Sequence, residues 1–381
     1  MEEKKLKKFL IFLSMVILFN IQLGQATANN NYEDINTENL LTFIEDFLDR
    51  RTSAMTEETD SILLLKSSNG QIKESEDIFS FEKTTLAELD TRRDVLKQWG
   101  EAYSHHITKI NLKNKEMKNG AIVLDIEEYT ELYYKKVTGE EPEYTAWVSE
   151  RQFIFEKLPT GQWNLISQQL LNPNGPTPMN EPTGITREEM NQALTNISTL
   201  QNEEDNKLRL MDELISPSSA VIQGSFSRTK ARDYALKYWK NYNNNYRKFD
   251  NDCTNFISQA MYAGGWTHKS GFYRDSQYWW YNSLNQSWSW IGVPYWHDFA
   301  LKHSKRTVKL SSPRSLWEGE VLQVDFTNNG VKDHTMIVTK KTSSEIYLTY
   351  HTNDTLNRSF ASISVTYPKA NWVPHMVKIS Y

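Results

Sequence analysis

The feature that most constrains the fold of this 381-residue chain is a proline- and glycine-rich segment near its middle. Residues 172–184 contain four prolines and two glycines, a composition typical of a connection between domains. Thr186 and Glu189 then form the pattern of a helix capping box, and an acidic helical stretch follows. We therefore expect a domain at 29–171, a linker and acidic helical spacer at 172–225, and a second domain at 226–381.

The two expected domains differ in charge. Residues 29–225 carry 19 basic and 35 acidic residues, a net charge of −16, whereas residues 226–381 carry 20 basic and 11 acidic residues, a net charge of +9. Such a division favours two interpretations, in which the acidic first domain docks on the basic second domain, or the basic domain meets an anionic surface such as the cell wall. Ordinary solvated faces are the alternative.

The first 28 residues have the features of a secretory signal peptide. A basic patch at 4–8 precedes an apolar run at 9–23, and Ala26-Thr27-Ala28 provides the small residues of a cleavage site. We expect cleavage after Ala28 and a secreted protein, extracellular or associated with the cell wall. An uncleaved membrane anchor is the alternative.

The first domain is expected to be α+β, because helical periodicity gives way to alternation typical of strands. Helices are predicted at 36–54 and 86–103. Four strands are predicted after them, near 105–113, 119–136, 143–157 and 161–171, joined by turns that contain Gly120, Gly139 and Gly161. Helices followed by an antiparallel meander give this fold class.

The second domain is also expected to be a small α+β fold. Its first helix carries Ala231, Tyr234 and Tyr238 on one face, and a second helix begins near the cysteine. Strands are predicted near 320–326, 334–341, 345–351 and 360–367.

The chain has one cysteine, Cys253. Asp252 is a suitable N-cap and Gly264-Gly265 ends the helical pattern, so the thiol is predicted at a helix N-terminus. There the free amides and the positive end of the helix dipole favour a thiolate and can hold an oxyanion, as a cysteine hydrolase requires. The alternative is that Cys253 is a small core residue in line with Phe256 and Ile257.

Two histidines follow on a predicted hairpin. His334 begins one strand and His351 ends the next, so antiparallel pairing through the turn near 341–344 places the two ends side by side. A thiolate needs a base, and the base needs a group that orients it. The order of Cys253, His334 and His351 therefore favours a catalytic site over isolated histidines.

Several separated motifs resemble one family. They are Asp252-Cys253-Thr254-Asn255-Phe256-Ile257-Ser258-Gln259, Gly264-Gly265, Ser289-Trp290, Gly319-Glu320-Val321, His334 and His351-Thr352-Asn353-Asp354. Over about residues 226–375 the chain resembles the putative amidase domain family of secreted bacterial proteins, which is similar to the papain-like CHAP and NlpC/P60 peptidases. Glu320 stands where relatives often have Asp.

The resemblance implies a papain-like second domain with Cys253 as nucleophile and His334 as base. His351 matches the orienting residue of those relatives, while Asn353 and Asp354 are alternatives for that role. Trp280 and Trp290 are candidates to line a groove for peptide or sugar, although such residues are more often core. The sequence shows no zinc-protease pattern, phosphate loop or paired-cysteine zinc site, so no metal, cofactor or nucleic acid is expected.

Three functions remain open at this point. The first is a cysteine-dependent amidase or peptidase that cleaves amide bonds, with cell-wall peptide as the expected substrate. The second is a non-catalytic papain-like module that binds cell-wall polymer or a partner protein. The third is acyl transfer, in which an amine replaces water in the second step.

Overall fold

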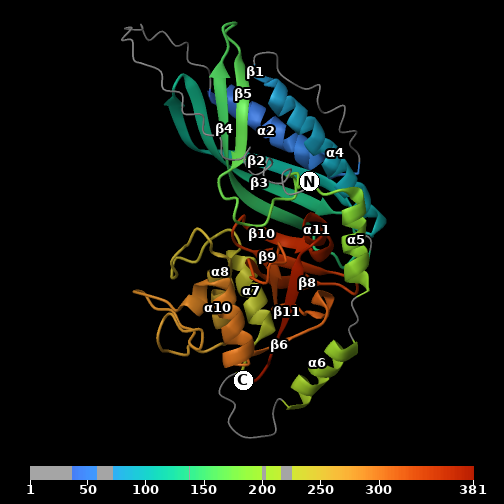
Figure 1. The fold of residues 1–381 in the computed structure, drawn as a ribbon, viewed down its shortest axis with the longest axis vertical. Coiled ribbons are helices and arrows are strands. Elements are labelled where there is room, and N and C mark those ends of the chain that lie inside the picture. The colour runs from blue at the N-terminus through green and yellow to red at the C-terminus, as the bar shows by residue number, and fades with distance from the viewer. Residues whose placement is uncertain (1–36, 58–71, 137, 200–202, 216–224) are drawn as a thin grey trace, which may run out of the picture. The chain divides into compact units, whose positions relative to one another are not determined.

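The computed structural model describes residues 37–57, 72–136, 138–199, 203–215 and 225–381, and the expected signal peptide lies outside these ranges (Figure 1). Residues Glu38–Tyr381 form one compact unit. The fold is mixed α+β, which confirms the expected class. The longer helices are α2 (Thr37–Ser53), α4 (Glu76–Gln98), α5 (Arg187–Ser198), α6 (Glu203–Ile215), α7 (Arg228–Tyr238), α8 (Cys253–Gly264) and α11 (Phe360–Thr366).

The short helical elements are α9 (Trp288–Ile291), α10 (Val293–His297), the π-helix η1 (Asp298–His303) and the 3-10 helix η2 (Pro313–Ser315). The strands of the first half are β1 (Ile72–Glu74), β2 (Tyr103–Lys118), β3 (Ala121–Tyr134), β4 (Tyr144–Lys157) and β5 (Trp163–Leu170). Those of the second half are β6 (Thr307–Lys309), β7 (Val321–Asp325), β8 (His334–Lys341), β9 (Ile346–Tyr350), β10 (Thr355–Ser359) and β11 (Asn371–Val377).

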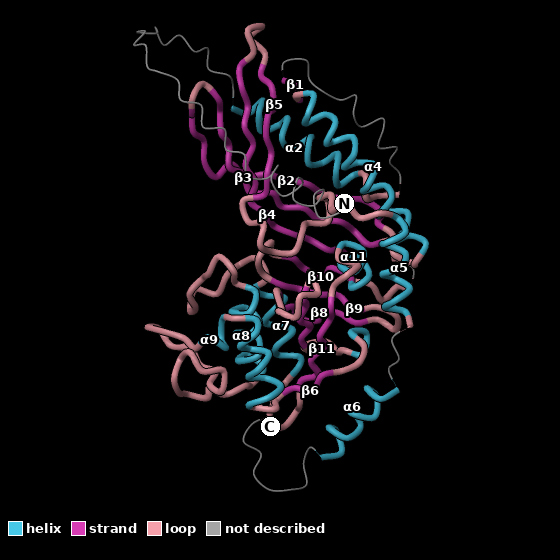
Figure 2. The backbone as a smooth tube through the Cα atoms, in the orientation of Figure 1, coloured by secondary structure: helices cyan, strands magenta, loops and turns pink. Residues whose placement is uncertain are grey.

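The strands of both halves belong to one sheet in the described part of the chain (Figure 2). Strands β2 to β5 pair in chain order, each antiparallel to the next. Strand β10 then pairs with β4, with Thr355 opposite Trp147, and leads through β9 and β8 to β7, β11 and β6. The sheet therefore continues from residues of the expected first domain into those of the second.

Most of the predicted elements lie close to their predicted ranges, with one exception, whereas strands β1, β6, β10 and β11 were not predicted. The predicted strand at 360–367 is wrong, because residues Phe360–Thr366 form helix α11. The side chain of Ser359 accepts the backbone N–H of Ser362 and so caps this helix. Every residue of α11 is buried, and Ser362, Ser364 and Thr366 alternate with apolar residues, which is the pattern that predicts a strand.

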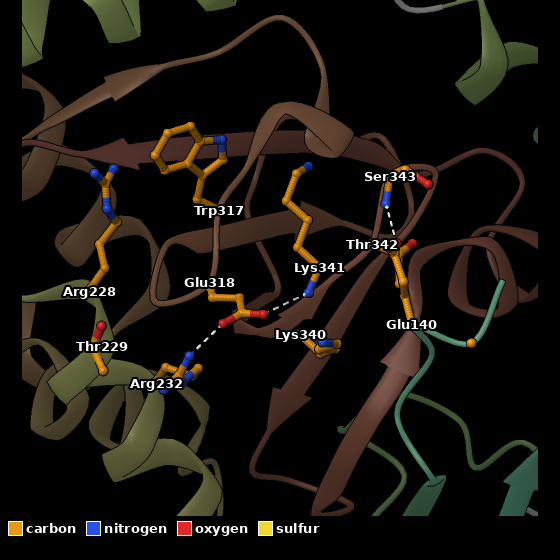
Figure 3. A pocket seen from close by; sticks show the side chains of 11 residues that line it. Glu140, Arg228, Thr229, Arg232, Trp317, Glu318, Lys340, Lys341, Thr342 and Ser343 are labelled. Atoms are coloured by element: carbon orange, nitrogen blue, oxygen red, sulfur yellow. Dashed lines mark hydrogen bonds and ion pairs between the residues drawn. The ribbon is translucent and has the colours of Figure 1, made fainter. Parts of the chain in front are cut away.

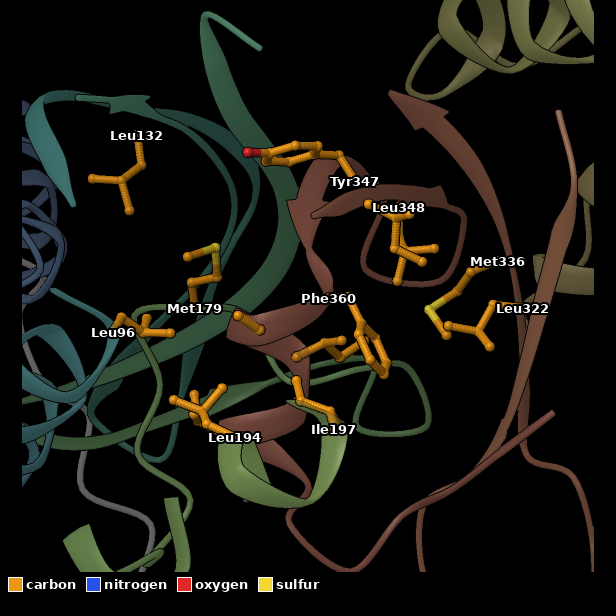
Figure 4. Close-up of a cluster of buried hydrophobic side chains, with 14 of the residues drawn as sticks. Leu96, Leu132, Met179, Leu194, Ile197, Leu322, Met336, Tyr347, Leu348 and Phe360 are labelled. Carbon is orange, nitrogen blue, oxygen red and sulfur yellow. The ribbon is translucent and has the colours of Figure 1, made fainter. Parts of the chain in front are cut away.

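Alternation along β8 divides its side chains between two cores. Met336 and Val338 belong to a core shared with α4, α5 and α11, part of which is drawn in Figure 4. Ile337 belongs to a second core, with Phe256 and Ile257 of α8. Helix α8 therefore packs on the face of the sheet from which Ile337 projects.

The Pro/Gly segment 172–184 packs into the fold. Met179 belongs to the first core, and Asn180 and Glu181 are buried. The Glu181 carboxylate binds the guanidinium groups of Arg51 in α2 and Arg151 in β4. Prolines alone predict an exposed connection, but these partners hold the segment in place.

Candidate active site

Cys253 is the first residue of α8 and only 4% exposed. Asp252 stands at the N-cap, but its side chain makes no capping bond to the helix. Instead its Oδ1 accepts the Phe249 N–H at 3.0 Å and the Asn255 amide at 2.8 Å. The helix ends at Gly265, whose φ of 117° is left-handed, as the glycine pair predicts. The thiol therefore lies beside first-turn amides that no side-chain cap covers.

The sulfur of Cys253 lies between α8 and the start of β8. Its Sγ is 3.8 Å from Thr254 Oγ1, and Thr254 Oγ1 is 3.1 Å from Thr335 Oγ1. Burial raises the pKa of the Cys253 thiol to about 11, although hydrogen bonds from Thr254 and from the Thr335 backbone act in the opposite direction. The thiol is therefore neutral near pH 7 in this arrangement.

His334 begins β8, directly before Thr335, and is 1% exposed. Its Nε2 is buried and has no hydrogen-bond partner in the described residues. Its ring lies edge-on against Tyr350, with centroids 5.2 Å apart, and 6.2 Å from Phe326. Burial lowers the pKa of His334 to about 3, so the imidazole is neutral near pH 7 and binds a proton only weakly in this arrangement.

His351 is engaged by groups other than His334. Its Nδ1 is 2.6 Å from Asp252 Oδ2, and its Nε2 donates to the Tyr238 carbonyl at 3.0 Å. Its ring stacks on Phe256 at 3.9 Å. Burial opposes the charged form, but the Asp354 carboxylate and the Asp252 hydrogen bond outweigh it, so the pKa of His351 is raised. His351 therefore ties the end of β9 to the N-terminus of α8.

The other two candidates for the orienting role also bind elsewhere. The Asn353 amide donates to the carbonyls of Asn172 at 3.2 Å and Pro176 at 3.1 Å. Asp354 Oδ1 accepts the Tyr242 hydroxyl at 2.9 Å. The residue that faces the His334 ring is Tyr350, which sequence reasoning missed. The register of β8 and β9 indicates this contact. Ile337 pairs with Thr349, and because side chains alternate along each strand, residues 334 and 350 project from the same face of the sheet.

The two candidate groove tryptophans have different environments. Trp290 is fully buried in the second core, and its Nε1 donates to Asn255 Oδ1 at 2.8 Å. Trp280 is partly exposed and donates to the Gly271 carbonyl at 3.0 Å. Trp290 therefore packs behind α8, and Trp280 alone presents surface to solvent.

A cavity of about 1020 Å³ lies at the far end of β8 from His334 (Figure 3). Lys340 and Lys341 line it from β8, together with Arg228 and Arg232 of α7. Glu318 pairs with Arg232 at 2.6 Å, so part of the positive charge is neutralised. No sequence motif indicates this cavity, and Cys253 does not line it.

Among the described residues, no helix is long and apolar enough to cross a membrane. Within the same ranges, no group of three or more His, Cys, Asp or Glu side chains is arranged to hold a metal ion.

The fold and site define an α+β chain whose second half carries the cysteine helix, and this part has recognisable relatives. Residues 225–373 match the family described as "Putative amidase domain", which supports an amidase-domain family for this half and suggests amide hydrolysis.

Two curated proteins of Bacillus subtilis (strain 168) are similar in sequence. "Uncharacterized protein YhbB" is 37% identical over 119 residues, which is 30% of this chain and 38% of that protein. "Uncharacterized protein YjcM" is 30% identical over 155 residues, which is 38% of this chain and 34% of that protein. The matches thus span little more than a third of each relative. No solved structure matches the chain.

The buried His334 predicts a pH dependence of stability. Its pKa is about 3 in the folded protein and near 6.5 when exposed, so its contribution is present above pH 6.5 and lost as pH falls below it. We expect the free energy of unfolding to fall by up to about 1.4 kcal/mol per pH unit from this group. Urea unfolding at several pH values gives the free energy of unfolding as a function of pH. This free energy should change less steeply with pH for His334→Gln than for the unmodified protein.

The control for this comparison is His303→Gln, which changes an exposed histidine. Its slope is expected to match that of the unmodified protein. Equal slopes for all three proteins would mean that His334 is not held neutral by burial.

Proposed function

We propose that the chain is a cysteine amidohydrolase with Cys253 as nucleophile and His334 as base. The observation that carries the proposal is the position of Cys253 at the start of α8, with the backbone of Thr335, the residue after His334, beside its sulfur. The Nε2 of His334 is buried and unpartnered in the described residues, as are several other side-chain atoms there. Such an atom calls for an explanation, and a catalytic role is the one proposed for His334. His334 and Thr335 project from opposite faces of β8, so the proposed proton transfer requires the His334 ring to turn toward α8.

In this mechanism His334 Nε2 takes the proton from Cys253 Sγ, and the thiolate adds to the amide carbon. The negative oxygen of the tetrahedral intermediate then accepts hydrogen bonds from the backbone N–H groups in the first turn of α8. His334 returns the proton to the leaving amine, which leaves a thioester on Cys253. A water molecule, deprotonated by His334, attacks the thioester and releases the carboxylic acid and the thiol.

Cell-wall peptide is the proposed substrate class, and export through the N-terminal signal peptide is part of the proposal. The net charge of +9 on residues 226–381 supports contact with an anionic polymer, and the partly exposed Trp280 supports binding of a peptide or sugar. We also propose that the second half of the chain is related to the papain-like CHAP and NlpC/P60 peptidases.

The test is incubation of the mature protein with purified cell walls and, separately, with peptides. Released amines measure cleavage, and the intact mass of the protein measures an acyl group on Cys253. We expect both on at least one substrate. Absence of cleavage and of any acyl adduct on all substrates, with Cys253 still reduced, would refute the proposal. Added amines in the same assay distinguish transfer from hydrolysis.

A non-catalytic binding module is the second candidate. The observation that favours it is that no hydrogen bond joins Cys253 to His334 in the described residues, and both groups are neutral. The discriminating measurement is labelling of Cys253 with iodoacetamide near neutral pH. In a catalytic pair the labelling rate falls in His334→Ala. A labelling rate that this substitution does not change favours the binding module.

A further inference from the structure

Residues 172–177, called the strap below, lie across the loop that follows β9. The side-chain amide of Asn353 donates to two strap carbonyls, those of Asn172 at 3.2 Å and Pro176 at 3.1 Å. The Asn172 side chain donates in turn to the carbonyl of Asp250 at 3.4 Å, two residues before Asp252. One end of the strap is therefore fixed beside the residues that lead into α8.

The middle of the strap approaches Thr352 too closely for a side chain. A Cβ placed on Gly175 would lie 2.4 Å from the Thr352 carbonyl oxygen. Thr352 has a φ of 70°, which is an outlier for a β-branched residue, and its hydroxyl accepts the Asp252 N–H at 3.1 Å. One strained residue thus separates the strap from the start of the cysteine helix.

The other end of the strap lies on the side of His334. The Thr177 N–H donates to the Tyr367 hydroxyl at 2.6 Å, and that hydroxyl donates to Thr177 Oγ1 at 2.9 Å. The Tyr367 ring packs on Phe326 with centroids 4.1 Å apart, and Phe326 stacks against His334. Arg358 also donates to the Thr177 carbonyl at 2.8 Å. The strap therefore spans the surroundings of both candidate catalytic residues.

The contacts that hold the strap are mostly directed at its main chain. Asn353 and Arg358 bind carbonyls of residues 172, 176 and 177, and Tyr367 binds the N–H of residue 177. A bound peptide of another sequence offers the same carbonyls and amides, whereas the Gly175 position excludes a side chain. This is the pattern of recognition expected for an extended peptide.

We propose that the strap occupies the peptide-binding groove of the candidate site and keeps Cys253 and His334 covered until it is displaced. The proposal rests on the function proposed above. Both residues are nearly fully buried in the described structure, which is the state that a covered site predicts. The substrate it implies is an extended peptide with glycine at the position of Gly175. Displacement of the strap is a local opening that leaves the rest of the fold intact.

Two variants of the full mature chain test the covering role. Gly175→Ala brings a methyl group against the Thr352 backbone. Tyr367→Phe removes the two hydrogen bonds between the Tyr367 hydroxyl and Thr177 while keeping the ring on Phe326. Each is expected to raise the rate of iodoacetamide labelling of Cys253 by about fivefold to tenfold, the shift expected from one lost contact of this kind. Because Cys253 is the one cysteine of the chain, the label reports on this site alone.

The matched controls are Asn174→Ala, at an exposed strap position, and Tyr347→Phe, on β9 against Tyr134. Both are expected to label at the rate of the unmodified protein. Limited proteolysis reports whether the strap has opened. Faster proteolysis of Gly175→Ala or Tyr367→Phe without faster labelling overturns the covering role. Unchanged proteolysis and labelling overturn the claim that these contacts hold the strap.

A peptide with the sequence of residues 172–177 tests the groove itself. Added in excess to Gly175→Ala, it is expected to slow Cys253 labelling back toward the unmodified rate, and a peptide with alanine at the glycine position is not. Equal effects of both peptides, or none, overturn the groove assignment. Faster labelling without hydrolysis of any substrate leaves the strap proposal intact and refutes the proposed hydrolase. Hydrolysis at a rate that the strap variants do not alter supports the proposed hydrolase and refutes the strap proposal.

Discussion

Replacement of Cys253 with alanine is expected to lower the rate of amide hydrolysis by at least about a thousandfold, because covalent catalysis has no substitute nucleophile in this site. The residual rate is the catalysis that remains from substrate binding and from stabilisation of the oxyanion by the first-turn amides of α8. Alanine fits the space of the buried thiol, so the fold should remain. Hydrolysis of the substrate identified on cell walls or peptides measures the loss.

Ser258→Ala is the matched control for this substitution. Ser258 lies on the same helix, is buried, and accepts the Trp279 Nε1–H at 3.0 Å. Both variants lose one small polar atom from α8, but Ser258 belongs to the core behind the helix. We expect Ser258→Ala to keep most of the activity. Activity retained by Cys253→Ala at a similar level would exclude the thiol as nucleophile.

Local patterns in the sequence were sufficient for the elements that carry the candidate site. The start of α8 at Cys253 and its end at Gly265 follow from residues within the helix and its caps. Strand β8 begins at His334, as its apolar run predicts. The long strands β3 and β4 alternate buried and less buried positions, which is the signal that a half-buried strand leaves in a sequence.

Partners from distant parts of the chain could not be predicted in this way. His351 and Asp252 are 99 residues apart, and nothing in the local spacing selects Asp252 over His334 as the partner of His351. The pairing of β10 with β4 joins segments more than two hundred residues apart. The burial of Asn180 and Glu181 depends on charges supplied by α2 and β4, whereas the prolines of residues 172–184 alone are typical of an exposed linker.

Replacement of Arg151 with methionine is expected to lower the free energy of unfolding by about 3–5 kcal/mol, because it leaves the buried Glu128 carboxylate without its cation. Arg151 is fully buried and binds Glu128 at 2.5 Å as well as Glu181. Arg51 still binds Glu181 at 2.5 Å, but Glu128 loses its guanidinium partner. Urea or thermal unfolding of the two proteins at the same pH measures the difference.

The control for Arg151→Met is Lys302→Met, which breaks an exposed pair with Asp298, four residues earlier in the chain. Such a pair contributes little, so almost no change in stability is expected. A similarly small loss for Arg151→Met would mean that the buried charges are not coupled to folding. Arg151 and Arg51 both bind Glu181, four residues beyond the strap, so loss of Arg151 weakens this anchor. We therefore expect the strap to open at denaturant concentrations below global unfolding. Faster iodoacetamide labelling of Cys253 before the main transition would register that release.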